Sequence, residues 1–276
     1  MDRWGIVSDA LAFLIAEKIS FDDYLNIIKK FYREQEYLPA LEVSDQLTFL
    51  YAITPSRIAD VSKEFHRLQL KIPENKTDKN SLMLRGVIAE RLGVLDEAYA
   101  KKLELRFRDY GKVEPNMKQA VAVAYARVYN DFEAIVKKFR ESESDEDRVR
   151  LLSSLMSFKE PTLIALSLGL ALSGEVKRQD IGTVIRLVLG NPDARNITWT
   201  WLKVNLGRLG RVLEGTGTLS RILFSAIPIL GIGKVTAVER FFDENRILGS
   251  EKGIKAGLER LRIYDRLANN LSKIVS

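Results

Sequence analysis

His66 is the only histidine in this sequence of 276 residues, so any chemistry that needs an imidazole depends on it. A zinc site of the HExxH type requires two histidines one helical turn apart, and one histidine cannot supply it. A Ser–His–Asp triad would also need His66, but the sequence has no GxSxG elbow to offer a serine nucleophile. We therefore interpret His66 as a structural or surface residue, and we expect no catalytic residue and no metal ligand in this chain.

Two glycine-rich segments could be taken for phosphate-binding loops. Residues 231–234 (GIGK) resemble the end of a P-loop, but Val235 stands where that loop has a metal-binding Ser or Thr. Residues 215–217 (GTG) lack the third glycine of a dinucleotide-binding fingerprint. Both segments are predicted to be turns. The sequence also has no cysteine, which excludes disulfides, thiolate nucleophiles and cysteine-ligated zinc.

The positive charge of the chain is concentrated near its carboxyl end. Residues 201–276 contain 13 Lys or Arg and 7 Asp or Glu, so they carry the whole net charge of +6. Solvated helix surfaces are the ordinary explanation, and a surface that meets an acidic group or partner is the alternative. Trp199 and Trp201 lie in this region, but residues two apart on a helix point about 200° away from each other. The two indoles therefore cannot form one stacking platform for nucleic-acid bases.

The elements that carry these residues are predicted to be helices. Apolar residues recur at the i, i+3, i+4, i+7 spacing of an amphipathic helix almost everywhere, as in Phe21, Tyr24, Leu25 and Ile28. No segment shows a sustained alternation of apolar and polar residues, so we expect no sheet. Short connections between helices of similar length make neighbours antiparallel. The sequence thus predicts an all-α fold, an α-solenoid of degenerate HEAT/ARM-like helix pairs.

Local signals place the ends of several helices. Ser20 with Asp23, and Ser144 with Asp147, have the spacing of a capping box. Helix starts are also predicted at Pro55, Pro161 and Pro192, and helix ends at Gly93, Gly111, Gly174 and Gly190. The polar stretches 73–80 (PENKTDKN) and 141–147 (ESESDED) are predicted loops, too short to be domain linkers. We therefore predict a single helical solenoid domain over residues 1–276.

Motifs in five parts of the chain occur in the order of a known family. They are residues 2–10 (DRWGIVSDA), residues 114–129, residues 150–167, residues 174–205 and residues 238–242. The fourth part contains GEVKRQDI at 174–181, Asn191-Pro192 and WTWLKVN at 199–205. Together they resemble the carboxy-terminal helical domain of gluzincin zinc aminopeptidases of the puromycin-sensitive, endoplasmic-reticulum and tricorn-interacting-factor type.

The resemblance implies a non-catalytic role in peptide trimming. In these enzymes separate amino-terminal domains hold the zinc, and the helical domain forms a concave bowl that encloses the peptide and closes over the catalytic domain. The implied partners are therefore a zinc catalytic domain, in cis or in trans, and peptides, with no cofactor in this chain. In some members basic groups lie near the carboxyl end of the peptide. The natural candidates for peptide or partner contacts here are Lys203, Arg208, Arg211, Arg260, Arg262 and Arg266.

Two other functions stay open at this point. The chain could be a stand-alone HEAT-like interaction scaffold that self-associates into a homo-oligomer through an apolar face. A basic HEAT-type nucleic-acid-binding protein is less favoured, because only the pI of 9.3 and the basic carboxyl end suggest it. The sequence has no apolar stretch of membrane-spanning length and no secretory signal, so we expect a cytoplasmic protein without a membrane partner. The absence of cysteine with abundant Lys, Glu and Arg is also typical of thermophiles.

Overall fold

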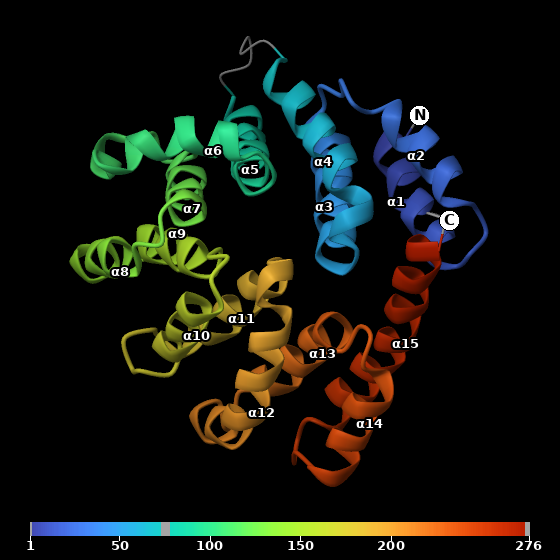
Figure 1. Ribbon diagram of the computed structural model, residues 1–276, viewed down its shortest axis with the longest axis vertical. Helices are drawn as coiled ribbons and strands as arrows, with labels where there is room; N and C mark the ends of the chain where they lie inside the picture. The colour runs from blue at the N-terminus through green and yellow to red at the C-terminus, as the bar shows by residue number, and fades with distance from the viewer. Residues whose placement is uncertain (1, 73–77, 274–276) are drawn as a thin grey trace. The chain divides into compact units, whose positions relative to one another are not determined.

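The computed structural model describes residues 2–72 and 78–273 of the chain. In this part of the chain the regular elements are fifteen α-helices and four short 3-10 helices, with no strand (Figure 1). The predicted all-α fold class is confirmed. Contacts divide the chain between Ser154 and Leu155 into two compact units. The solenoid, its concave bowl and the single domain over residues 1–276 remain predictions.

The amino-terminal unit is built from helices that pack against their neighbours in the sequence. Its elements are α1 (Arg3–Ile15), α2 (Phe21–Lys29), α3 (Tyr37–Ile53), α4 (Pro55–Leu70), α5 (Lys79–Leu95), α6 (Glu97–Leu103), η1 (Glu104–Phe107), η2 (Tyr110–Lys112), α7 (Lys118–Val128), α8 (Phe132–Glu141) and α9 (Asp145–Leu155), whose last residue crosses the division. The closest pairs are α3 with α4, α4 with α5, and α5 with α7. This pattern is the succession of helix pairs that short turns impose.

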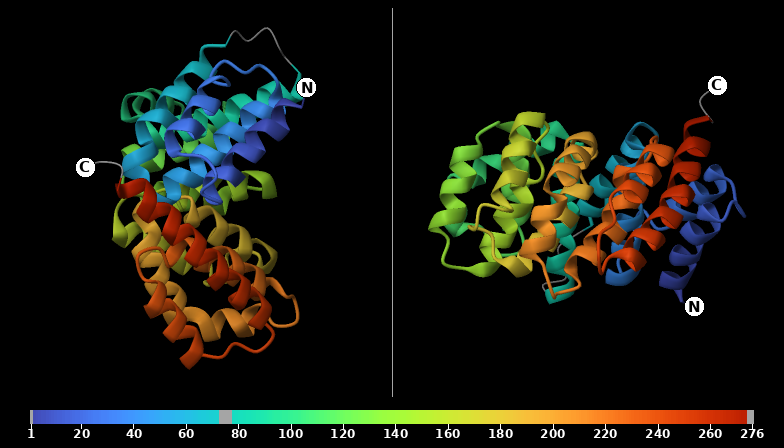
Figure 2. Two further views of the ribbon diagram at one scale, coloured as in Figure 1. Left: turned by 90° about the vertical axis from the view of Figure 1, so that its right-hand side faces the viewer. Right: turned by 90° about the horizontal axis from the view of Figure 1, so that it is seen from below.

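The carboxy-terminal unit contains the tightest helix pair of the described residues. Its elements are α10 (Pro161–Leu170), η3 (Arg178–Asp180), α11 (Ile181–Leu189), η4 (Pro192–Ala194), α12 (Arg195–Val212), α13 (Thr218–Leu230), α14 (Val235–Glu244) and α15 (Glu251–Lys273). Helices α13 and α15 lie side by side (Figure 2). A Cβ atom added to Gly253 would lie 2.2 Å from the carbonyl oxygen of Ser220, so the two backbones approach as only glycine allows.

Most of the predicted helix ends are found where local chemistry puts them. The capping box at the start of α2 is complete, with Asp23 N 3.0 Å from Ser20 Oγ and Ser20 N 3.2 Å from Asp23 Oδ2. At the start of α9, Asp147 N donates to Ser144 Oγ over 3.3 Å. Helices α4 and α10 begin at Pro55 and Pro161 and η4 begins at Pro192, while Gly190 ends α11.

Two predicted helix ends and the extents of two predicted loops need correction. Gly93 does not end a helix, because α5 continues to Leu95. A Cβ atom added to Gly93 would make an ordinary contact, 3.7 Å from the Cβ of Ala124 on α7, so packing does not require glycine there. Gly111 lies inside the short 3-10 helix η2, whereas Gly174 has a φ of +99° in the turn after α10. Of the predicted loop at 73–80, residues 73–77 lie outside the described residues, and α5 already begins at Lys79 after the cap residue Asp78. The loop at 141–147 is shorter than expected, because α8 ends at Glu141 and α9 begins at Asp145.

Candidate functional site

The single histidine is enclosed in the core of the amino-terminal unit. His66 has no exposed surface, its Nδ1 lies 2.5 Å from the Ser62 carbonyl oxygen, and its Nε2 lies 2.8 Å from Ser44 Oγ. Because a carbonyl only accepts, Nδ1 carries the proton and Nε2 accepts from the Ser44 hydroxyl. Burial, with the nearby charge of Arg91, lowers the pKa of His66 to about 3. His66 is therefore a neutral structural residue, in a Ser–His pair that no substrate can reach.

The carboxylates of the described residues do not assemble into a metal site. No group of three or more His, Asp or Glu side chains in residues 2–72 and 78–273 has the arrangement to hold a metal ion. Glu90 on α5 is partly buried, and its carboxylate accepts from Gln119 Nε2 at 2.8 Å and from Ser153 Oγ at 3.4 Å. Burial raises the pKa of Glu90. Its hydrogen bonds connect α5 to α7 and α9, which is a structural role.

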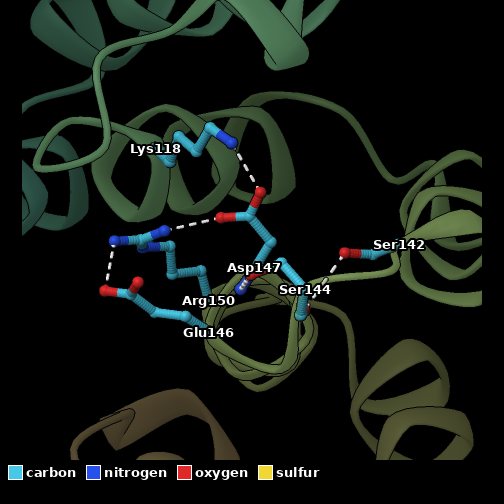
Figure 3. Close-up of polar contacts among 6 residues, drawn as sticks. All are labelled: Lys118, Ser142, Ser144, Glu146, Asp147 and Arg150. Atoms are coloured by element: carbon cyan, nitrogen blue, oxygen red, sulfur yellow. Dashed lines mark hydrogen bonds and ion pairs between the residues drawn. The ribbon is translucent and has the colours of Figure 1, made fainter.

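A network of opposite charges joins α7 to α9 in the amino-terminal unit (Figure 3). Lys118 of α7 and Arg150 of α9 both bind the carboxylate of Asp147, each at a distance of 2.5 Å, and Arg150 also binds Glu146 at 2.6 Å. Burial would raise the pKa of Asp147, but the hydrogen bonds from Lys118 and Arg150 outweigh it and keep the pKa below its usual range. These charges are neutralised within the fold.

A cavity of about 400 Å³ lies beside this network. The phenol of Tyr110 lines it, and its buried hydroxyl has no hydrogen-bond partner among the described residues. The remaining lining residues are of both charges: Lys118, Lys138, Glu141, Glu143 and Asp147, with Gly111, Ser142, Ser144 and Leu151. Because Lys118 and Asp147 already bind each other, this cavity offers no cluster of one charge to a ligand.

Three of the six basic candidates lie on α12 in the carboxy-terminal unit. All three are exposed. Lys203 extends over the ring of Trp199, with Nζ 5.5 Å from the ring centroid. Arg208 donates from Nη2 to the carbonyl oxygen of Leu172 at 2.7 Å, so it fastens the turn after α10. Arg211 has no carboxylate partner among the described residues and remains open to a ligand.

The other three candidates lie on α15. Arg262 is paired with Glu239 of α14 at 2.6 Å. Arg260 is half-buried, with its guanidinium carbon 4.7 Å from the centroid of the Phe224 ring. Arg266 is exposed. The six residues thus do not form one site, because two of them, Arg208 and Arg262, are already bound to other parts of the same unit and Arg260 packs against an aromatic ring.

The carboxy-terminal unit also has a basic groove that none of the six residues lines. It lies between α11 and α13, has a volume of about 400 Å³ and includes the apolar side chains of Ile185, Leu189 and Ile222. The polar lining consists of Arg186 and Arg221 with Gln179, Thr183, Thr218 and Ser225. Neither arginine has a carboxylate partner among the described residues. Two cations beside an apolar wall suit an acidic group that is attached to an apolar one.

Comparison with known proteins identifies the family. The family model of the ERAP1-like C-terminal domain matches residues 1–263. The chain belongs to this family. The resemblance expected from the five ordered motifs is therefore confirmed.

Archaeal aminopeptidases are among the relatives of this ERAP1-like C-terminal domain. It is 38% identical over 269 residues to a leucyl aminopeptidase of Saccharolobus solfataricus, covering 97% of the chain and 34% of that protein. It is 34% identical to probable aminopeptidase 2 of Sulfurisphaera tokodaii, over 97% of the chain and 34% of that protein. It is 30% identical to the tricorn protease-interacting factor F2 of Thermoplasma acidophilum, over 98% of the chain and 35% of that protein. The chain thus spans about a third of the length of these relatives. Among the helices that the structure describes, none is both long enough and apolar enough to cross a bilayer.

The groove of this ERAP1-like C-terminal domain was not predicted from the sequence. Arg186 belongs to residues 1–200, whose charges balance, so the excess of basic residues pointed away from it. Arg221 stands 35 positions later in the sequence, and only the packing of α11 against α13 brings the two side chains to one groove. One feature of the sequence could have indicated this groove. Arg186 lies on the exposed face of α11, whose other face is formed by the buried residues Ile181, Val184, Ile185 and Val188.

Proposed function

We propose that this chain is the non-catalytic helical domain of a zinc aminopeptidase that trims peptides. In this role it binds part of the peptide, closes the substrate chamber and associates with a zinc catalytic domain, in cis or in trans. The match of the family model over residues 1–263 carries the proposal, and relatives named as aminopeptidases support it. Zinc would belong to the separate catalytic domain, and the cytoplasm is the proposed location.

The groove between α11 and α13 is the proposed site for the carboxyl end of the peptide. Arg186 and Arg221 supply two guanidinium groups to one carboxylate, and guanidinium groups bind carboxylates with directed hydrogen bonds. Ile185, Leu189 and Ile222 supply apolar contact for the last side chain of the peptide. A partly enclosed groove strengthens the attraction because water screens the charges less. Among the six basic residues predicted from the sequence, Lys203 and Arg211 have no carboxylate partner in the described part of the chain and remain the better candidates for further peptide contacts.

Complementation with a related catalytic part tests this function. The Saccharolobus leucyl aminopeptidase would be expressed without the third that matches this chain, and then with this chain added. We expect no hydrolysis of an aminoacyl arylamide by the chain alone with zinc supplied, and faster peptide hydrolysis by the truncated enzyme when the chain is present. Turnover by the pure chain, or an unchanged rate after the addition to a folded truncated enzyme, would overturn the proposal.

One observation favours a second function, that of an interaction scaffold. Helix α1 exposes two large apolar side chains, with 45% of Trp4 and 50% of Phe13 accessible to solvent. The two residues lie nine positions apart and therefore on opposite sides of α1, so each exposed aromatic side chain suits a separate protein contact, either to a catalytic domain or to a second copy of the chain. Light scattering distinguishes the two. A monomer over a wide concentration range contradicts self-association and leaves α1 as a contact for another domain.

A further inference from the structure

Helix α12 and the residue before α14 bring two lysines to one place in the carboxy-terminal unit. Lys234 directly precedes α14, and its Nζ donates to Asn196 Oδ1 on α12 at 2.8 Å. Arg195, Trp199 and Lys203 follow at intervals of four residues, so they share one face of α12 beside Asn196. The side chain of Lys234 therefore reaches the helix face that already carries Arg195 and Lys203.

The positive charges of this group are close enough to affect each other. Burial lowers the pKa of Lys234, and the charges of Arg195 and Lys203 lower it further. Neither Lys203 nor Lys234 has a carboxylate partner within residues 2–72 and 78–273. Two lysine charges that are held close together without a carboxylate cost free energy, and an anionic ligand removes that cost.

The groups that hold the lysines are themselves fixed. The ring of Trp199 is buried and contacts Phe241 and Phe242 of α14, with centroid distances of 5.4 and 6.2 Å. Lys203 Nζ rests 5.5 Å above the centroid of this ring. Asn196 uses Oδ1 to hold Lys234, which leaves its Nδ2 group to donate to a ligand. The site is thus preorganised on α12 and α14.

We propose that Lys203, Lys234 and Asn196 form a binding site for a phosphate dianion, either inorganic phosphate or a phosphate monoester. One carboxylate balances a single cation, whereas a phosphate dianion balances two and presents three or more acceptor oxygens to the lysine and amide donors. The site shares no residue with the groove between α11 and α13, so phosphate binding does not depend on the proposed binding of the peptide's carboxyl end in that groove.

Calorimetric titration of the full chain with phosphate tests this site. At pH 7.5 and constant ionic strength in chloride, we expect saturable binding of one inorganic phosphate per chain and much weaker binding of acetate. Glycerol phosphate in a parallel titration distinguishes the two sources, because a site for monoesters binds it at least as tightly as inorganic phosphate. A site for the free ion binds inorganic phosphate more tightly.

Lysine variants locate the binding. Lys203→Met and Lys234→Met should each weaken phosphate binding about tenfold, since each removes one charge-assisted hydrogen bond. The control Lys252→Met removes an exposed lysine of α15 and should bind as the parent does. Circular dichroism and thermal melting of every variant establish that it is folded. Equal phosphate affinity in the parent and a folded double variant of Lys203 and Lys234, no saturable binding by the parent, or acetate affinity equal to that of phosphate would overturn the proposal.

Discussion

The two units of the chain differ in whether their clustered cations are paired with a carboxylate of the fold. In the amino-terminal unit, Asp147 lies between Lys118 and Arg150, so the half-buried cations are neutralised by the fold itself. In the carboxy-terminal unit, Arg186 and Arg221 line one groove, and Lys234, which precedes α14, reaches the face of α12 that carries Lys203. None of these four cations has a carboxylate partner in the described residues. Charges that the fold satisfies stabilise it, and charges that it leaves open are free to bind a ligand. We therefore expect the first set to contribute to stability and the second to recognition.

The largest expected effect concerns the satisfied charges. Asp147→Asn removes the counter-charge of Lys118 and Arg150, whose side chains are only 15% and 13% exposed. We expect a loss of about 2–3 kcal/mol in the free energy of unfolding at pH 7, measured by urea denaturation, because two poorly hydrated cations lose their partner. The matched control is Asp109→Asn, which breaks an exposed pair with Lys112 and should cost less than about 0.5 kcal/mol.

The stability difference between the parent and Asp147→Asn should also depend on pH, which gives a second test of the network. The pKa of Asp147 is lowered in the folded state, so its contribution is complete above the ordinary aspartate pKa of 3.8 and is lost as the pH falls through the folded pKa. The stability difference between the parent and Asp147→Asn should therefore be constant near neutrality and shrink in acid below about pH 4. Equal losses for Asp147→Asn and Asp109→Asn at pH 7 would show that the network in Figure 3 is no more than a surface ion pair.

The next largest effect concerns His66. Like Asp147, it should make the protein less stable as the pH falls, but over a higher pH range. Its pKa falls from 6.5 to about 3 on folding, so the unfolded chain takes up a proton below pH 6.5 that the folded chain refuses. Stability should thus decrease as the pH falls from 6.5 towards 3, by about 2 kcal/mol at pH 5 relative to pH 7. His66→Gln should lower stability at pH 7 and remove this share of the slope between pH 7 and 5. An unchanged slope in a folded His66→Gln variant would mean that the imidazole titrates in the native state.

The sequence predicts what depends on neighbouring residues and misses what depends on packing between helices. The capping box of Ser20 and the helix start at Pro55 follow from contacts within one turn, and both were predicted. The helix end predicted at Gly93 is wrong because α5 continues to Leu95, and no contact of Gly93 within its own turn indicates this. The sequence places Lys234 in a segment that resembles the end of a P-loop, and nothing in it indicates that Lys234 binds Asn196. Local spacing therefore predicts the helices, whereas sites assembled from two helices require the structure.

The smallest expected change in stability tests the charges that the fold leaves open. Arg186 is exposed and has no partner in the described residues, so Arg186→Gln should alter the free energy of unfolding by less than about 0.5 kcal/mol. Peptide binding should respond instead. Calorimetry of the chain with a decapeptide should show tighter binding with a free carboxyl end than with a carboxyl-terminal amide, and Arg186→Gln should reduce this preference, with the double variant of Arg186 and Arg221 abolishing it. The control Arg240→Gln changes an exposed arginine of α14 outside the groove and should keep the preference.

Two outcomes would contradict a binding role for the groove. One is a loss of stability in Arg186→Gln as large as that in Asp147→Asn, and the other is a preference for the free carboxyl end that survives in the folded double variant. Either would show that the arginines of the groove stabilise the fold and do not bind the peptide.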